Sequence, residues 1–288
     1  MLGVATINSL LKDSKTDVIY AIVRKNSANV HRVPSDSRIK IIECDLKDLQ
    51  SLPSLIGKKC DIFYHFAWSG TGHNRGDVRI QIDNIRYTYD SFVSAMALGC
   101  STYVGAGSQA EYGAMDGSVV DETTVACPNI PYGIAKYAAG ELLRNMSKNV
   151  SINCIWVRIF SVYGFFDKDT SLISSILRNR DSGADFNLSA GTHLWDYLFA
   201  SDAGDAFRTI GFNATEDDLI CLASGDPRSL KYFIEEIDEI LHPLCNFKYG
   251  AKDVAPINLN VDISKIKTKY GWEPKISFKE GIALIAKE

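Results

Sequence analysis

Five short runs of apolar, mostly β-branched or aromatic residues constrain the fold of this chain more than any other feature. The runs are Val18–Val23, Ile39–Cys44, Ile62–Phe66, Thr102–Ala106 and Ile152–Val157. Each is apolar almost throughout, which is typical of parallel strands that are buried on both faces. Helical patterns at 3–12, 78–98 and 132–148 lie between them. Strands that alternate with helices predict an α/β protein with a doubly wound parallel sheet.

The pattern changes after about residue 163, where a smaller C-terminal lobe is expected. Helical stretches are predicted at 170–180, 202–212, 229–241 and 278–287. Strands are predicted near 185–189, 193–199, 218–222 and 258–262. We therefore expect one domain over 1–162 and a second over 163–288 that is interleaved with the first.

Charge and composition exclude several classes of protein. The chain of 288 residues has 31 Lys and Arg against 35 Asp and Glu, a net charge of −4, so it lacks the basic surplus of a dedicated nucleic-acid binder. Its apolar runs are too short to predict a membrane span. Seven scattered cysteines and five histidines show no metal-ligand spacing. Reduced thiols, no metal site and a cytoplasmic location are expected.

Tyr132-Gly-Ile-Ala-Lys136 is the first candidate for catalytic chemistry. In a helix this spacing places the phenol and the ammonium on one face, about one turn apart. A nearby cation stabilises phenolate and moves the pKa of the tyrosine toward the working range of a general acid/base. With 13 tyrosines and 31 basic residues, however, such a spacing arises about once by chance. The motif therefore needs support from elsewhere in the chain.

Ser108 supplies that support. It lies in Gly105-Ala-Gly-Ser-Gln-Ala-Glu-Tyr-Gly113, directly after the predicted strand 102–106. The carboxyl ends of parallel strands are where ligands bind in open α/β sheets. A hydroxyl there can hydrogen-bond a substrate oxygen while Tyr132 exchanges its proton. The alternative is a serine that belongs only to a glycine-rich turn.

Further motifs follow in order along nearly the whole chain. They are Met1-Leu-Gly3, Asp45-Leu46, His65-Phe-Ala67, Asn84-Ile-Arg-Tyr-Thr88, Arg158-Ile-Phe-Ser-Val-Tyr-Gly164, Trp195-Asp-Tyr197 and Gly271-Trp-Glu-Pro274. With Ser108, Tyr132 and Lys136 they resemble the extended short-chain dehydrogenase/reductase family, the NAD-dependent epimerases, dehydratases and reductases of nucleotide-linked sugars. The family's first strand and the first two glycines of its Gly-x-x-Gly-x-x-Gly turn have no counterpart here.

The resemblance implies a Rossmann-like NAD(P)-binding domain over 1–162 and a substrate-binding lobe over 163–288. It implies that Tyr132 passes a proton to or from a sugar oxygen, that Ser108 orients this oxygen, and that Lys136 lowers the pKa of the tyrosine and holds the nicotinamide ribose. Cofactor contacts are expected at Gly3, Arg24, Asp45, Leu46, Ala67, Asn84 and Lys136. Substrate contacts are expected at Ser108, Ser161 and Trp195.

Departures from the family's pattern narrow the activity. Gln109-Ala110 stand where family dehydratases carry Asp-Glu, so a dehydratase is not expected. Ser161 and Trp195 replace the Asn and Arg that face the nucleotide diphosphate, which leaves the nucleotide open.

The residue after the strand 18–23 bears on the cofactor. An acidic residue there would bind the ribose of NAD, whereas Arg24 suits the 2′-phosphate of NADP. NADP is therefore favoured over NAD, unless the loop is simply a solvated basic surface.

Hydride transfer at a hexose carbon, C4, of a nucleotide-linked sugar is the expected activity. A 4-keto-sugar reductase is the first expectation and an NAD-dependent 4-epimerase the alternative. A non-catalytic relative remains open, because without the family's first strand the edges of 18–23 and 62–66 lack their shared neighbour and weak cofactor binding is expected. The resemblance also implies a homodimer formed through the helices at 78–98 and 132–148.

Overall fold

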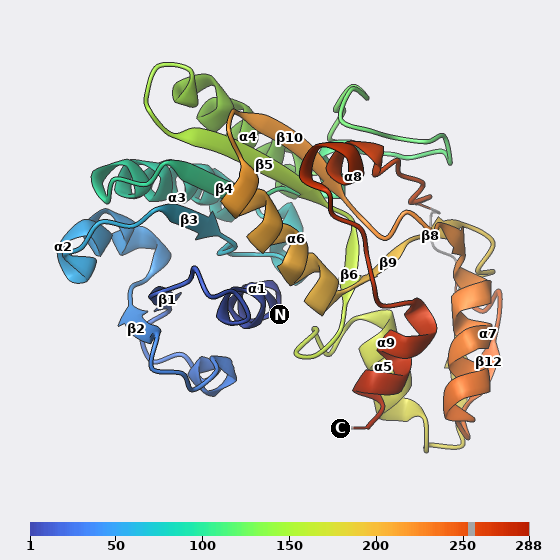
Figure 1. The fold of residues 1–288 in the computed structure, drawn as a ribbon. Coiled ribbons are helices and arrows are strands. Elements are labelled where there is room, and N and C mark those ends of the chain that lie inside the picture. Colours follow the sequence, from blue (N-terminus) through green and yellow to red (C-terminus); the bar gives the residue numbers. More distant parts are fainter. Residues whose placement is uncertain (253–256, 288) are drawn as a thin grey trace.

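Two groups of parallel strands form the centre of the computed structural model, which describes residues 1–252 and 257–287. The larger group has the order β10–β5–β4–β3. Its strands are β3 (Ile62–His65), β4 (Thr102–Ala106), β5 (Asn153–Ile159) and β10 (Asp218–Leu222). The smaller pairs β1 (Ile19–Val23) with β2 (Ile39–Glu43). The doubly wound α/β fold predicted from the sequence is confirmed (Figure 1).

The sheet is divided where the sequence predicted unshared edges. Among the described residues no strand joins β1 to β3, so the two groups remain separate. Within the larger group, Val104 pairs with Tyr64 on one side and Ile155 on the other. This register aligns the carboxyl ends of the strands along one edge.

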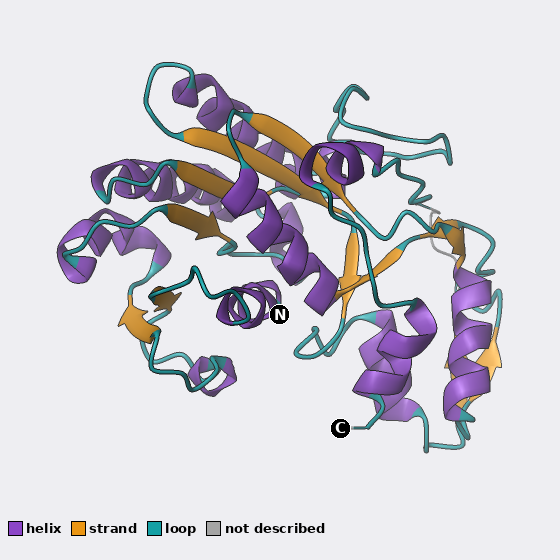
Figure 2. Cartoon of the chain, in the orientation of Figure 1, coloured by secondary structure: helices purple, strands orange, loops and turns teal. Residues whose placement is uncertain are grey.

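Helices cover both faces of the sheet (Figure 2). Helices α3 (Val78–Ala97) and α4 (Pro131–Ser147) pack together on one face. Helices α1 (Leu2–Leu11), α6 (Ala200–Asn213) and α8 (Ser264–Tyr270) lie on the other. Short helical segments complete this part: η1 (Val30–Arg32), η2 (Leu46–Ser51), α2 (Leu52–Ile56), η3 (His73–Gly76) and η4 (Gln109–Glu111).

Burial on both faces explains why the apolar runs predicted β4 and β5 well, whereas β2 was expected to be buried too but has exposed and half-buried residues. All five residues of β4 are buried. Its Val104 packs into the core beneath α6, and its Tyr103 packs toward Phe92 of α3 on the opposite face. Uniformly apolar sequence is what such a double environment requires.

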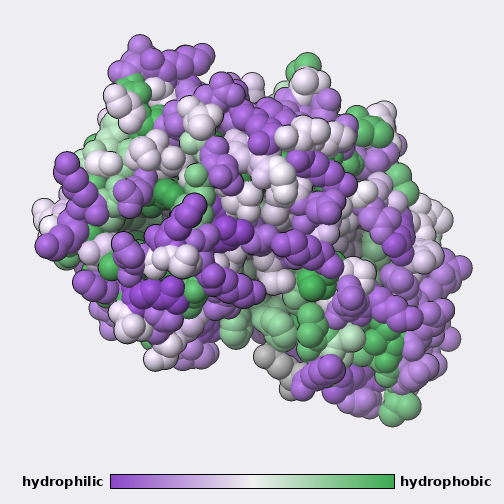
Figure 3. All heavy atoms as spheres, in the orientation of Figure 1, coloured by the Kyte–Doolittle hydropathy of each residue, from purple (hydrophilic) through white to green (hydrophobic). Residues whose placement is uncertain are grey.

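The C-terminal lobe has its own apolar core. Its elements are α5 (Leu172–Asn179), β7 (Asp185–Asn187), α7 (Leu230–Leu241), β12 (Asn246–Lys248) and α9 (Phe278–Ile285). Ile176, Phe233 and Ile282 lie at the centre of that core. In Figure 3 polar residues cover most of the visible face, and apolar residues gather over this lobe at the lower right. Residues 253–256 and 288 of the expected lobe lie outside the described residues.

Two strand predictions for the second half were wrong in detail. The run 193–199 forms two strands, β8 (Leu194–Trp195), which pairs with β11 (Arg228–Ser229), and β9 (Tyr197–Phe199), which pairs with β6 (Ser161–Tyr163). Asp196 separates them because its buried carboxylate accepts from the backbone N–H groups of Ser224 (2.7 Å) and Gly225 (2.9 Å).

The predictions for 218–222 and 258–262 had different outcomes. The first is confirmed as strand β10, which is hydrogen-bonded to β5 of the main sheet. The second forms no strand and contributes a single bridge between Val261 and Val120.

None of the helices in the described part of the chain combines the length and hydropathy that crossing a bilayer requires.

Candidate active site

Ser108 is held firmly at the carboxyl end of β4. Its hydroxyl accepts a hydrogen bond from the backbone N–H of Ala110 (3.2 Å) and caps η4. Its own backbone N–H donates to the carboxylate of Glu111 (2.8 Å), which completes a reciprocal capping box. The hydroxyl proton is not used by the cap, so Ser108 can donate it to a ligand.

Glu111 anchors this turn from behind. It is fully buried and also accepts from Nε of Arg158 (2.8 Å) and Nε1 of Trp156 (3.0 Å). The indole of Trp156 fits only because Gly105 and Gly140 lack side chains. A Cβ atom at these positions would lie 2.5 Å and 2.7 Å from it. The burial of Glu111 and its three donors leave the carboxylate no role as a proton-transfer group for a substrate.

Tyr132 and Lys136 project from the first turns of α4 and are both buried. Pro131 occupies the first helical position, where its fixed φ suits a helix and its missing N–H costs nothing. The preceding Ile130 is extended, as a residue before proline prefers to be. The start of the helix therefore follows directly from the sequence, and it fixes the position of Tyr132 in the first turn.

Burial raises the pKa of Tyr132, while the neighbouring Ser108 hydroxyl and the Arg75 guanidinium act to lower it. Arg75 lies with Cζ 4.2 Å from the centroid of the tyrosine ring. The ring of Trp68 meets it edge-on at a centroid distance of 6.1 Å. At neutral pH Tyr132 is thus a protonated phenol that can donate.

Lys136 lies one helical turn after Tyr132, and its ammonium is bonded to the end of β4. Its Nζ donates to the carbonyl oxygen of Ala106 (2.6 Å) and lies 3.7 Å from the centroid of a Trp68 ring, but 6.0 Å from the ring centroid of Tyr132. Burial lowers the pKa of Lys136 to about 7. Ser108 and Arg75 act to lower the pKa of Tyr132 in this arrangement, and the expectation that Lys136 lowers it as well stays a prediction.

Trp68 and Arg75 were missed by the sequence analysis. Both lie between β3 and α3, in a segment with no periodic pattern. Buried Gln81 fixes this segment: its Oε1 accepts from Nε1 of Trp68 (2.9 Å), and its Nε2 donates to the carbonyl oxygens of Gly70 and Asn74 (3.2 Å each). The available signals were an aromatic residue, Trp68, two positions after a predicted strand, and an arginine, Arg75, further along the same segment.

Asn84, whose expected contact with the cofactor stays a prediction, supports this segment. It is 1% exposed. Its amide oxygen accepts from the backbone N–H of Ser69 (2.9 Å), and its nitrogen donates to the Ser69 carbonyl (2.8 Å) and to Gln81 (3.3 Å). Both amide hydrogens are therefore already bonded within the chain.

The remaining predicted cofactor residues lie near the carboxyl ends of β1, β2 and β3 or in α1. Arg24 and Ala67 are exposed, and the carboxylate of half-buried Asp45 accepts from the N–H of Lys25 (3.1 Å). Leu46 is half-buried at the start of η2. At Gly3, in the first turn of α1, an added Cβ atom would have a ring carbon of Phe66 as its nearest neighbour, at 3.8 Å, so the backbone there has room.

This donor set fits NAD(P). Arg24 offers an accessible cation for a phosphate, and the Asp45 carboxylate can accept from an adenine amino group. Lys136 is an ammonium with three N–H donors, of which one is used by Ala106. No group of three or more metal-ligating side chains occurs within residues 1–252 and 257–287.

Ser161 and Trp195, the two predicted substrate residues of the lobe, lie together. The indole Nε1 of Trp195 donates to the hydroxyl of Ser161 (3.0 Å), and both side chains are half-buried. The positions where the family carries an Asn and an Arg are therefore neighbours here, joined by one hydrogen bond.

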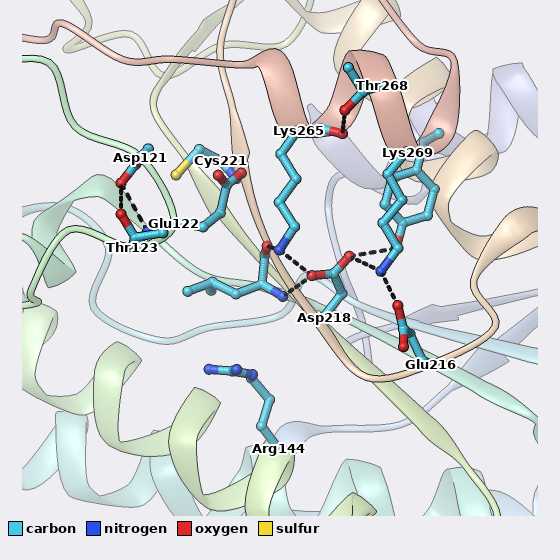
Figure 4. Close-up of polar contacts among 12 residues, drawn as sticks. Asp121, Glu122, Thr123, Arg144, Glu216, Asp218, Cys221, Lys265, Thr268 and Lys269 are labelled. Atoms are coloured by element: carbon cyan, nitrogen blue, oxygen red, sulfur yellow. Dashed lines mark hydrogen bonds and ion pairs between the residues drawn. The ribbon is translucent and has the colours of Figure 1, made fainter.

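A separate polar pocket of about 390 Å³ lies between α4, β10 and α8, and none of Ser108, Tyr132 and Lys136 lines it. Its charges are largely paired. Lys265 and Lys269 of α8 donate to Asp218 of β10 (2.5 and 2.8 Å), as Figure 4 shows. We assign this network to holding α8 against the sheet.

Three curated relatives are about a quarter identical to the chain over the residues that align. A dTDP-glucose 4,6-dehydratase of Xanthomonas campestris is 25% identical over 57% of this chain, which spans half of that protein's length. A UDP-glucose 4-epimerase of Rhizobium meliloti is 24% identical over 80% of the chain and 78% of the epimerase. A dTDP-4-dehydro-6-deoxyglucose reductase of Escherichia coli is 25% identical over 72% of the chain and 67% of the reductase.

Solved structures show the same fold. An epimerase of Methanothermobacter thermautotrophicus superposes with a TM-score of 0.88 at 18% identity, covering 99% of this chain and 88% of the other. A dTDP-glucose 4,6-dehydratase of Bacillus anthracis in complex with NAD gives 0.85 at 17% identity, covering 100% and 92%. RMD of Pseudomonas aeruginosa, complexed with NADPH, gives 0.76 at 18% identity, covering 88% and 90%.

The family model described as "NAD dependent epimerase/dehydratase family" matches residues 1–218. That stretch contains the whole arrangement around Ser108, Tyr132 and Lys136 and well over half of the chain. The chain belongs to the NAD dependent epimerase/dehydratase family.

Proposed function

We propose that the protein is an NADP-dependent reductase of a 4-keto group on a nucleotide-linked hexose. The observation that carries this proposal is a buried, protonated Tyr132 next to the free hydroxyl proton of Ser108 at the carboxyl end of β4. Reduction of a ketone needs a proton donor at the oxygen, and a tyrosine with a raised pKa is held in the donating form. The bound nicotinamide supplies the hydride.

The residues of this chain divide the remaining work. Ser108 donates a hydrogen bond to the ketone oxygen and orients it. Tyr132 gives its proton to that oxygen as the alcohol forms. Lys136 binds the cofactor ribose with N–H groups that Ala106 does not use. Trp195 and Ser161 contact the substrate from the C-terminal lobe, and Arg24 holds the 2′-phosphate of NADP.

Dehydration receives no support from this site. Gln109 and Ala110 carry no carboxylate, and Glu111 is buried beneath three donors. Elimination of water needs an acid/base pair that reaches the sugar. We therefore do not propose dehydratase activity for this chain.

The test of the proposal is the stoichiometry of the cofactor. Purified protein is incubated with NADPH and a panel of nucleotide-linked 4-keto-hexoses, and NADPH loss is followed by absorbance. The proposal requires one NADPH consumed per sugar reduced, and none in a Tyr132→Phe control. Interconversion of 4-epimers with no net NADPH consumption would instead establish the alternative, an NAD-dependent 4-epimerase, which the similarity to UDP-glucose 4-epimerases supports.

The alternative of another class is a non-catalytic protein. Such a protein would bind a nucleotide sugar without turnover, which calorimetry on the same panel detects. A homodimer through α3 and α4 is supported by exposed apolar side chains on these helices, among them Ile82, Ile134 and Leu142. Light scattering measures whether the protein is dimeric.

A further inference from the structure

Charged and polar groups approach Tyr132 from several elements. Ser108 and Glu111 face it from η4, and Lys136 lies one turn along α4. Arg75 approaches from η3, with Lys168 of the segment after β6 close to it. Of these groups, Glu111 disfavours phenolate, whereas Ser108 and Arg75 favour it. The phenolate that remains once Tyr132 has given up its proton therefore has two cations near its ring, Lys136 and Arg75.

Lys136 is directed elsewhere. Its ammonium donates to the Ala106 carbonyl and lies against the face of Trp68, and burial brings its pKa to about 7. Its Nζ lies 6.0 Å from the centroid of the Tyr132 ring, and at neutral pH the amine is only partly charged, so a second cation at this ring would add to the stabilisation of phenolate.

Arg75 is a second cation at this ring, nearer to its centroid than Lys136. Its Cζ is 4.2 Å from the ring centroid of Tyr132. Within the described ranges no carboxylate forms an ion pair with it, and its buried Nε has no hydrogen-bond partner. An arginine keeps its charge at every pH at which a protein stays folded. Its charge is therefore available to Tyr132.

The segment that carries Arg75 is fixed at several points. Gln81 donates to the carbonyl of Asn74 next to Arg75 and to that of Gly70. Nζ of Lys168 donates to the carbonyl of Thr71 (3.0 Å). A guanidinium held in this way does not need to be ordered when Tyr132 ionises, which is the requirement for effective charge stabilisation.

We propose that Arg75 is a positioning residue for Tyr132 whose guanidinium stabilises the phenolate formed during proton transfer. In that step the O–H bond of Tyr132 breaks, its proton forms an O–H bond with the substrate oxygen, and the phenolate later takes a proton from water. The role in turnover rests on the proposed function. The effect on ionisation does not, because Tyr132 ionises without any substrate.

The test measures the ionisation of Tyr132 directly. The protein is labelled with fluorotyrosine, whose phenol ionises at lower pH than tyrosine, and titrated by ¹⁹F NMR. The resonance of residue 132 is the one missing from Tyr132→Phe. Removing a positive charge disfavours phenolate, so Arg75→Gln should raise this pKa by about 1 unit or more. Arg75→Lys should retain most of the parent value.

A matched control comes from the same region. Arg79 lies in the first turn of α3, is exposed, and is close in sequence to Arg75. Arg79→Gln should leave the titration of residue 132 unchanged. Circular dichroism melting of each variant verifies that it is folded, and the Arg75→Lys variant separates loss of charge from loss of packing.

Two results would overturn the proposal. An unchanged pKa of residue 132 in folded Arg75→Gln would show that the guanidinium does not serve Tyr132. A pKa that rises equally in Arg75→Gln and Arg75→Lys would show that packing, and not charge, matters. A parent protein that is inactive on every sugar would contradict the proposed function and leave this measurement intact.

Discussion

At the scale of single residues, opposing forces on Tyr132 decide the chemistry. Burial keeps the phenol protonated, while Ser108 and Arg75 make loss of the proton less costly. A proton donor needs both: it must hold its proton until the substrate is bound and then release it. The geometry around this one ring therefore supports a donor more than a permanent phenolate.

Tyr132→Phe tests this function with little change in packing. The ring and its contacts with Trp68 and Arg75 remain, and only the hydroxyl is lost. Turnover should fall by about 10²–10⁴-fold, while the Kd for NADPH stays within a small factor of the parent value. Steady-state kinetics and fluorescence titration measure the two quantities. Activity within tenfold of the parent would exclude Tyr132 as the proton donor.

Arg24→Ala tests the choice of cofactor. The exposed guanidinium follows β1, and a charge-assisted contact with a phosphate is lost with it. NADPH affinity should fall by about tenfold or more, and NADH affinity should change little. Calorimetric titration with both cofactors compares them within one variant. If both affinities fall equally, the basic loop after β1 does not read the 2′-phosphate.

At the scale of elements, sequence patterns predicted what is periodic or uniformly buried and little else. The strands of the main sheet were found because burial on both faces demands apolar runs. The pattern of 193–199 predicts one strand, because the sequence does not show that the Asp196 carboxylate accepts from two backbone N–H groups of another segment. Trp68 and Arg75 were missed for the same reason, since the path of a loop depends on partners such as Gln81 far along the chain.

The contact of α4 with β5 gives a prediction in which two effects compete. Gly140→Ala replaces a glycine inside a helix, which alone would stabilise by about 1 kcal/mol. The new Cβ would lie 2.7 Å from the indole of Trp156, however, and overpacking costs about 1–3 kcal/mol. We expect net destabilisation in denaturant unfolding, with loss of activity because Trp156 also supports Glu111 behind Ser108.

The control for that variant is Gly3→Ala in α1. A Cβ there would have its nearest neighbour at 3.8 Å, an ordinary van der Waals distance. This change should leave the free energy of unfolding unchanged or raise it by up to about 1 kcal/mol. Equal stabilities of Gly140→Ala and Gly3→Ala would mean that Trp156 moves aside freely.

At the scale of the whole molecule, the order of the family motifs predicted the topology. The loss of folding free energy caused by burying Lys136 is visible only in the structure. Lys136 is 3% exposed, and burial lowers its pKa from 10.5 to about 7. Such a shift corresponds to about 5 kcal/mol of differential free energy. The free energy of unfolding of a domain is only about 5–15 kcal/mol, so the burial of this lysine lowers the stability of the protein by a large fraction of that total.

Replacing the buried Lys136 by an apolar residue should stabilise the protein in a pH-dependent way. Between pH 7 and 10.5 the unfolded chain binds a proton at Lys136 that the folded chain has released, so the stability of the parent rises with pH across this window. Lys136→Met loses activity but should be more stable than the parent at pH 7, by about 2–4 kcal/mol once the lost bond to the Ala106 carbonyl is subtracted. The advantage should shrink as the pH rises and vanish or reverse near 10.5, where the lysine is neutral in both states. Denaturant unfolding of the two proteins at a series of pH values gives the difference in free energy of unfolding, in which the titration of all other groups cancels.

The control is Lys148→Met, at an exposed position just beyond the end of α4, which should show no such pH-dependent gain in stability. A difference between Lys136→Met and the parent that stays constant with pH would mean that Lys136 keeps its full charge in the folded protein.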